Sequence, residues 1–213
     1  MGTAIKHWEM LNCLTMAIRR DMPSFDLIVK EKHWLFKLLL RIDANFQRGV
    51  TVTIYPWVFM PKEIHDDPRL AWKVLAHEYV HLLQARKHVI LFFLCYAFPQ
   101  VLSILAICAS FSSFYFLLAL LFLLPLPAYY RMRYEMQGYI MSMAVNYWRY
   151  GFVHNDQKDF IKRVFSGSTY YYMWPFKRWI DRKINTESVN VERGYYDSSP
   201  VFNTVRILIE NVW

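Results

Sequence analysis

The 42-residue stretch from Val89 to Tyr130 contains no charged residue, and it constrains the fold more than any other feature of the sequence. It is too long for one transmembrane helix, which needs about 20 apolar residues, and about right for two. Small polar residues cluster near its middle, at Ser110, Ser112 and Ser113. The stretch therefore predicts a hydrophobic helical hairpin over residues 89–130, with Pro99 inside its first helix.

Basic residues flank both ends of this hairpin: Arg86 and Lys87 precede it, and Arg131 and Arg133 follow it. Positive charge is enriched on the cytoplasmic side of membrane proteins, so both ends are expected there. The prediction is a membrane protein with lipid as a partner and with its functional site facing the cytoplasm. The alternative is a buried helical pair or a hydrophobic docking arm, because about 170 residues remain outside the hairpin, enough for a core of their own.

Composition excludes several other classes of protein. Apolar residues make up 55% of the chain and charged residues 20%, which excludes a disordered chain. The three cysteines have no CxxC spacing, which excludes a zinc ribbon or a disulfide framework. The net charge is +8, but Lys and Arg are spread along the chain, so no specific nucleic-acid partner is predicted. Anionic lipid explains the basic residues near the hairpin equally well.

The segment His77-Glu78-Tyr79-Val80-His81 carries the chemistry of the sequence. A helix is expected from about Arg69 to Lys87, and on it the two histidines at i and i+4 project from one face and can bind one metal ion. Glu78 stands beside the first histidine, where its carboxylate can reach a metal-bound water. The neighbouring residues are of core type, so unpaired ionisable groups here would be costly. The alternative is a pair of histidines satisfied by hydrogen bonds in the core.

A catalytic zinc site needs three protein ligands and one open position. Glu135 is the only carboxylate between Glu78 and Asp156. It lies near the start of the helix expected at Arg131–Trp148, which returns from the hairpin and can lie alongside the two histidines. Glu135 is therefore the predicted third ligand. The alternative is a solvated glutamate paired with Arg131.

The remaining segments predict an α+β, mostly helical fold. Residues 3–20 have helical spacing of apolar residues, whereas residues 26–42 are ambiguous between strand and helix. Val50 to Met60 is rich in strand-forming residues, and Pro56 places a break or a sheet edge within it. We expect a single domain over residues 1–213 that has a short β-sheet edge and a hydrophobic hairpin inserted between the two metal-ligand helices.

The motif His77-Glu78-x-x-His81, followed by a glutamate on a later helix, resembles the gluzincin group of zincin-type zinc metallopeptidases. A hydrophobic hairpin between the ligand helices resembles the membrane-embedded M48 peptidases of the Ste24/HtpX type. The segments 77–84 and 134–139 are also similar to small bacterial and phage proteins with an HExxHxxQ helix. The sequence departs from the M48 pattern at Tyr139, where that family has an aspartate.

The resemblance implies a small zincin-like fold and zinc-dependent hydrolysis of a peptide or protein substrate. Zn²⁺ held by His77, His81 and Glu135 would polarise the scissile carbonyl and acidify a water, and Glu78 would transfer the proton to the leaving amine. The stretch 50–55 would pair with an extended substrate at the sheet edge. The candidates for stabilising the oxyanion of the transition state are His154, Tyr170, Tyr171 and Tyr172.

A non-enzymatic function is the competing hypothesis. A structural or assembly protein, such as a virion component or a membrane-docking subunit, could retain a zincin fold without turnover. Metal content and the effect of Glu78→Gln discriminate between the two, because only a catalytic protein needs both the metal and the carboxylate.

Overall fold

The computed structural model describes residues 2–40, 50–110 and 113–213, and this part of the chain is mostly helical with one small sheet. The prediction of a mostly helical α+β fold is thereby confirmed. The α-helices are α1 (Gly2–Asp21), α2 (Trp34–Leu40), α3 (Lys62–His65), α4 (Pro68–Arg86), α5 (Val89–Ala97), α6 (Tyr129–Tyr150), α7 (Asn155–Ser166), α8 (Lys177–Glu192) and α9 (Pro200–Val212). The 3-10 helices are η1 (Lys30–Lys32), η3 (Gln100–Ser110), η4 (Phe114–Leu123) and η5 (Ser168–Tyr170).

The sheet has three strands in the order β1-β3-β2, with β1 at Asp26–Val29, β2 at Val52–Ile54 and β3 at Trp57–Met60. Strand β1 is parallel to β3, whereas β2 is antiparallel to β3. The strand-forming segment 50–60 is thus a tight hairpin, broken where Pro56 predicts a break. It leaves β2 as an edge strand with β3 on one side.

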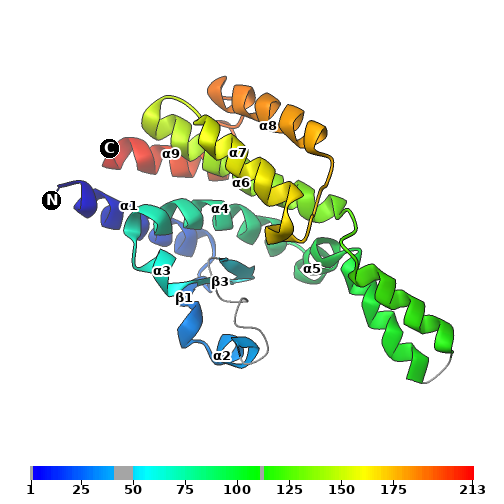
Figure 1. Ribbon diagram of the computed structural model, residues 1–213. Helices are drawn as coiled ribbons and strands as arrows, with labels where there is room; N and C mark the ends of the chain where they lie inside the picture. Colours follow the sequence, from blue (N-terminus) through cyan, green and yellow to red (C-terminus); the bar gives the residue numbers. More distant parts are fainter. Residues whose placement is uncertain (1, 41–49, 111–112) are drawn as a thin grey trace.

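Helix α4 lies at the centre of the molecule, with the sheet on one side and α6 and α9 on the other (Figure 1). The helix begins where the sequence predicts it, because Pro68 occupies its first turn and the Asp67 carboxylate accepts a hydrogen bond from the backbone N–H of Arg69 at 3.0 Å. The central position of α4 explains its many buried residues, since both faces are covered.

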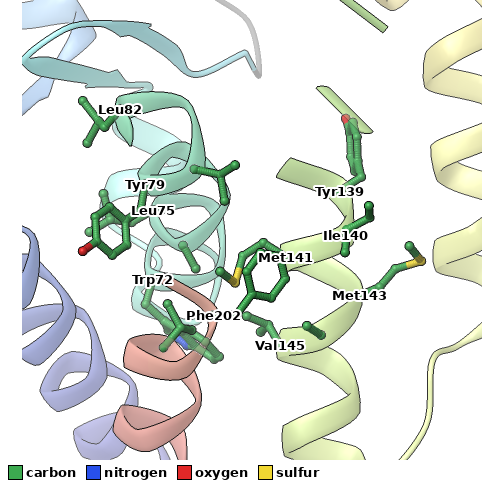
Figure 2. Packing of buried hydrophobic residues seen from close by; sticks show 14 of the residues in the cluster. Trp72, Leu75, Tyr79, Leu82, Tyr139, Ile140, Met141, Met143, Val145 and Phe202 are labelled. Carbon is green, nitrogen blue, oxygen red and sulfur yellow. The ribbon is translucent and has the colours of Figure 1, made fainter. Parts of the chain in front are cut away.

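The hydrophobic core is built mainly between α1, α4, α6 and α9. Figure 2 shows part of it, with Trp72 and Leu75 from α4, Met141 and Val145 from α6 and Phe202 from α9. All five of these side chains are buried. This packing fixes α4 against α6, and those two helices carry the predicted metal ligands.

Helix α6 ends where the sequence predicts a stop. Gly151 follows it in the left-handed region at φ +82°, a conformation that favours glycine. The backbone N–H of Gly151 donates to the carbonyl of Tyr147 at 2.7 Å and closes the last turn.

The first helix of the apolar stretch is shorter than the helix of about 20 residues that the sequence predicts. Helix α5 stops at Ala97, and η3 continues from Gln100 after a bend of 92°. The expectation that Pro99 lies inside the first helix is therefore wrong. Its physical cause is that proline forces the preceding residue, Phe98, into an extended conformation and has no N–H for the helical ladder.

The two 3-10 helices of this stretch lie side by side and project from the body of the molecule (Figure 1). Among the described residues, no single helix has the length and apolar character to cross a bilayer, although α5 and the first nine residues of η3 (Gln100–Cys108) reach that length together as a bent pair. Ser112, part of the predicted turn, lies outside the described residues.

Candidate metal centre

Two histidines from α4 and one glutamate from α6 meet in the interior of the protein. The Nε2 atoms of His77 and His81 are 3.2 Å apart. The Glu135 carboxylate lies opposite them, with Oε2 3.6 Å from His77 Nε2 and Oε1 3.7 Å from His81 Nε2. All three side chains are buried, and their ligand atoms lie within 4.8 Å of one another. This group could hold a metal ion.

The alternative of a solvated Glu135 paired with Arg131 is wrong. Glu135 is only 2% exposed. The Arg131 guanidinium instead donates to the backbone carbonyl of Tyr96 at 2.9 Å and to the side chain of Gln100 at 3.4 Å. Arg131 therefore ties α6 to the base of the apolar hairpin.

The donor set fits a cation that is bound by nitrogen and oxygen. Oxygen Oε1 of Glu135 accepts a hydrogen bond from the Tyr96 hydroxyl at 2.5 Å, but Oε2 is buried and has no hydrogen-bond partner. An unpartnered buried carboxylate oxygen is costly. It faces the His77 imidazole, so a cation between them would satisfy it. Two histidines and one carboxylate are a ligand set of catalytic zinc sites.

Hydrogen bonds at the far side of each imidazole orient the two histidines. His81 Nδ1 lies 2.8 Å from Gln84 Oε1, so Nδ1 carries a proton and Nε2 faces the cluster, where it can bind a metal ion once it gives up its own proton. Gln84 in turn donates to Gln137 on α6 at 2.8 Å. His77 Nδ1 lies 3.2 Å from the hydroxyl of Ser142. The sequence analysis predicted neither Gln84 nor Ser142 as a partner of the histidines. The signal for Gln84 was its position three residues after His81, which puts the two side chains on one face of a helix.

The charges of the histidines and of Glu135 stabilise one another. Burial by itself would lower the pKa of His81, but the Glu135 carboxylate beside it raises this pKa to about 9. Burial by itself would raise the pKa of Glu135, but the two imidazoles hold this pKa below its usual range. Without a metal the group is thus a buried ion pair, and a metal ion would compete with the bound proton.

Glu78 lies beside the cluster without joining it. Its Oε2 accepts a hydrogen bond from the Thr53 hydroxyl on β2 at 2.6 Å, which fixes the carboxylate against the edge of the sheet. The side chain is mostly buried, yet it borders two cavities. Glu78 therefore lies next to the metal ligands, and its second oxygen, Oε1, is not bound to Thr53.

The structure separates the four candidates for oxyanion stabilisation. Tyr170 borders a cavity together with Glu78, His81 and Glu135, and burial together with the Glu135 charge raises its pKa well above the ordinary value. The three others lie elsewhere. Tyr171 and Tyr172 are nearly half exposed, and His154 is exposed and packs against Phe152 at a ring distance of 4.2 Å.

Tyr139 is a site residue that sequence reasoning noted only as a departure from a family pattern. Its ring lies edge-on to the His77 imidazole at 4.8 Å, and it is buried. Burial, with the nearby Glu135 charge, raises the pKa of its hydroxyl above the ordinary value. The tyrosine therefore packs as a neutral group against the first histidine.

Two cavities adjoin the cluster and share part of their lining. One of about 410 Å³ is bordered by His77 and Glu78, and the other, of about 190 Å³, by Glu78, His81 and Glu135. A larger cavity of about 780 Å³ lies between α6 and α8 but touches none of these four residues. We assign the chemistry to these two cavities because they reach His77, Glu78, His81 and Glu135, whereas the larger cavity reaches the buried Glu187 instead.

Gly138 allows the close approach of α6 to the first histidine. A Cβ atom at this position would lie 2.5 Å from His77 Nε2, inside the contact limit. We therefore expect Gly138→Ala to displace the imidazole and weaken metal binding by roughly tenfold or more. Metal titration by calorimetry measures this effect. Gly151→Ala is the control away from the site, because no atom lies within 4 Å of its added Cβ and alanine there strains only the backbone at φ +82°. This variant should lose stability but keep its zinc affinity, and an equal loss of affinity in both variants would contradict the assignment.

Comparison with known proteins finds no relative of this chain. No protein-family model matches the chain, and neither does any curated protein or solved structure.

Proposed function

We propose that the protein is a zinc-dependent metallopeptidase. The observation that supports this function best is the buried Oε2 atom of Glu135, which has no hydrogen-bond partner and lies 3.6 Å from a histidine nitrogen. His77, His81 and Glu135 would hold the metal, as in the gluzincin-like arrangement that the sequence resembles. A zinc ion in this position supplies Lewis acidity, which lowers the pKa of water and polarises a carbonyl group.

The other side chains have separate roles in this proposal. Glu78 accepts a proton from the attacking water and delivers it to the leaving amine. Thr53 donates a hydrogen bond to one oxygen of that carboxylate at 2.6 Å, and the other oxygen takes the proton in this proposal. Tyr170 borders the same cavity and, as a neutral phenol, donates a hydrogen bond to the oxyanion.

The edge strand β2 supports a peptide as the substrate. It pairs with β3 through Val52, Thr53 and Ile54 on one side. An extended peptide added at its other side would gain main-chain hydrogen bonds. Thr53 lies on this strand and contacts Glu78, so a peptide bond at this edge would pass close to the metal ligands. A small zincin-like domain is therefore part of the proposal.

Removal and return of zinc tests this function. Dialysis of the purified protein against a chelator should abolish cleavage of a mixed peptide library, and about one equivalent of zinc should restore it. Cleavage products are identified by mass spectrometry. Zinc that binds without any cleavage would instead support the structural or assembly function, such as a virion component or a docking subunit.

The projecting hairpin supports membrane attachment as the second element of the proposal. Its side chains are apolar and largely exposed, among them Ile104, Phe114 and Leu118 at 60%, 79% and 62%. A large exposed apolar patch of this kind is typical of a surface that contacts a membrane or another protein. Aromatic and basic residues gather near its base, where Tyr171 contacts the carbonyl of Leu123. Such residues favour the lipid interface.

Vesicle flotation measures this attachment. We expect the full-length protein to float with liposomes that contain anionic lipid, and to lose flotation when Ile104, Phe114 and Leu118 are all replaced by Ser. Zinc binding should stay unchanged in that variant, because none of the three residues borders the metal cluster. A full-length protein that stays monomeric without detergent and does not float would contradict membrane attachment.

A further inference from the structure

The larger of the two cavities at the cluster has mostly apolar walls and one lysine. Apolar side chains from three helices form its walls: Ile64 from α3, Leu70 and Val74 from α4, and Phe160, Ile161 and Val164 from α7. Besides His77 and Glu78 at the metal cluster, Lys73 is the one Lys, Arg, His, Asp or Glu among the described residues that line it. The two tyrosines in the wall, Tyr139 and Tyr170, are neutral.

The position of Lys73 follows from the antiparallel packing of α4 and α6. His77 meets Ser142, and Lys73, four residues earlier on α4, meets Asn146, four residues later on α6. Four residues correspond to about 6 Å along a helix. The ammonium group thus lies about one helical turn away from the histidine, at the other end of the same cavity.

Polar groups around Lys73 complete a site for an anion. The Nζ atom donates to Asn146 Oδ1 at 3.4 Å, and the Asn146 amide donates to Gln157 Oε1 at 2.8 Å. The ring of Tyr150 lies 5.3 Å from Nζ and holds the side chain in place. Among the described residues, no carboxylate forms an ion pair with Lys73. The Arg149 guanidinium lies over the same Tyr150 ring, at 5.0 Å, and adds positive charge. A partly buried cation without a carboxylate partner favours a ligand that brings a negative charge.

We propose that this cavity selects a carboxylate group of the substrate, carried either by an acidic side chain or by the C-terminus of a peptide. Lys73 is the specificity-determining residue, and Asn146 and Gln157 position it. The inference rests on the proposed peptide hydrolysis, because it names the peptides that the site accepts. Val50 and Thr51 border both cavities, so a peptide along this segment can place one residue in each.

The second cavity predicts the other side of the cleavage site. It is bordered by Phe92, Phe93 and Tyr96 from α5, and Lys73 does not reach it. An apolar or aromatic residue fits there. The substrate would then have an acidic group on one side of the metal cluster and an apolar residue on the other.

Peptide binding to the zinc-loaded Glu78→Gln variant tests the selection without turnover. The probes are short fluorescent peptides with amidated ends that differ only in one residue, Glu, Gln or Lys, moved through each position. A further peptide lacks Glu but has a free C-terminus. Fluorescence anisotropy gives the affinities, and the same peptides are offered to the parent protein for cleavage.

We expect one carboxylate peptide to bind on the order of ten- to a hundredfold more tightly than its neutral counterpart. Adding Lys73→Met should remove this preference, and adding Lys73→Glu should reverse it in favour of Lys. Lys87→Met is the matched control, because Lys87 is exposed at the end of the same helix and should leave the preference intact.

The outcomes separate the two proposals. Equal binding of Glu and Gln peptides, or a preference that survives Lys73→Met, would overturn the selection even if peptides are cleaved. Selective binding without cleavage by the parent would overturn hydrolysis and leave the anion site standing. Tighter binding of the free C-terminus than of any Glu peptide assigns the site to peptide ends, and the reverse assigns it to acidic side chains.

Discussion

Glu78→Gln should retain about one zinc ion per chain and lose roughly two to four orders of magnitude in peptide cleavage, the usual contribution of a general base. The carboxylate lies beside the metal ligands and accepts a hydrogen bond from Thr53 at 2.6 Å, and the proposal assigns it to proton transfer and not to metal binding. Glutamine keeps the size of the side chain and can still accept the Thr53 hydrogen bond. It has no basic oxygen. Initial rates and zinc content, measured on the same preparation, provide the result.

Glu63→Gln is the control for this variant, because it makes the same chemical change on the exposed helix α3 and should leave the rate unchanged. A Glu78→Gln protein that cleaves peptides at the parental rate would remove the carboxylate from the mechanism. A variant that loses zinc as well would show that Glu78 is a ligand.

Glu135→Ala should lower zinc affinity by tenfold or more, since removal of even a supporting group near a metal costs that much. The variant removes the only oxygen ligand of the group and leaves two histidines on one helix. Zinc should also stop raising the melting temperature, because the stabilisation by a bound ligand depends on its concentration relative to the dissociation constant. Calorimetric titration and thermal unfolding with and without zinc measure both effects.

Glu9→Ala is the matched control, since Glu9 is exposed on α1. Circular dichroism verifies that the fold of each variant is intact, which matters because Tyr96 loses its hydrogen-bond acceptor in Glu135→Ala. If Glu135→Ala binds zinc as tightly as the parent, the third ligand lies elsewhere and the gluzincin-like arrangement fails, although the two histidines would still stand as ligands.

The sequence was sufficient to predict the components of the site that depend on local spacing. His77 and His81 are four residues apart, so they lie on one face of any helix that contains both. Glu135 is the only carboxylate between Glu78 and Asp156, which made it the natural candidate for the third ligand. Start and stop signals also placed α4 and α6 to within about two residues. The spacing of the histidines and the ends of the helices depend on residues that are close together in the chain, so they can be read from the sequence.

Contacts between distant segments were not predictable in the same way. Gly138 and Ser142 are ordinary residues of a helix until α4 and α6 cross. The crossing leaves no room for a Cβ at Gly138, which would lie 2.5 Å from His77 Nε2, and it brings the Ser142 hydroxyl to 3.2 Å from His77 Nδ1. That crossing depends on side-chain packing across more than 60 residues of chain. Thr53 likewise meets Glu78 only because the sheet packs on α4.

The apolar stretch shows a different limit of sequence reasoning. Hydropathy indicates that residues 89–130 avoid water, but it carries no information on the direction of the chain. The bend of 92° between α5 and η3 follows from Pro99, whose effect depends on whether neighbouring groups can replace the lost hydrogen bond. The expectation that the first helix continues through Pro99 was therefore wrong.

X-ray absorption at the zinc edge tests the central claim most directly. The purified full-length protein, titrated with one equivalent of zinc, should show two imidazole nitrogens and one carboxylate oxygen at about 2.0 to 2.2 Å, with one further light-atom ligand. The imidazole signal should fall in a His77→Ala, His81→Ala double variant. A spectrum with sulfur at about 2.3 Å would assign the zinc to cysteine, and a protein that binds no stoichiometric zinc would contradict the metal centre altogether.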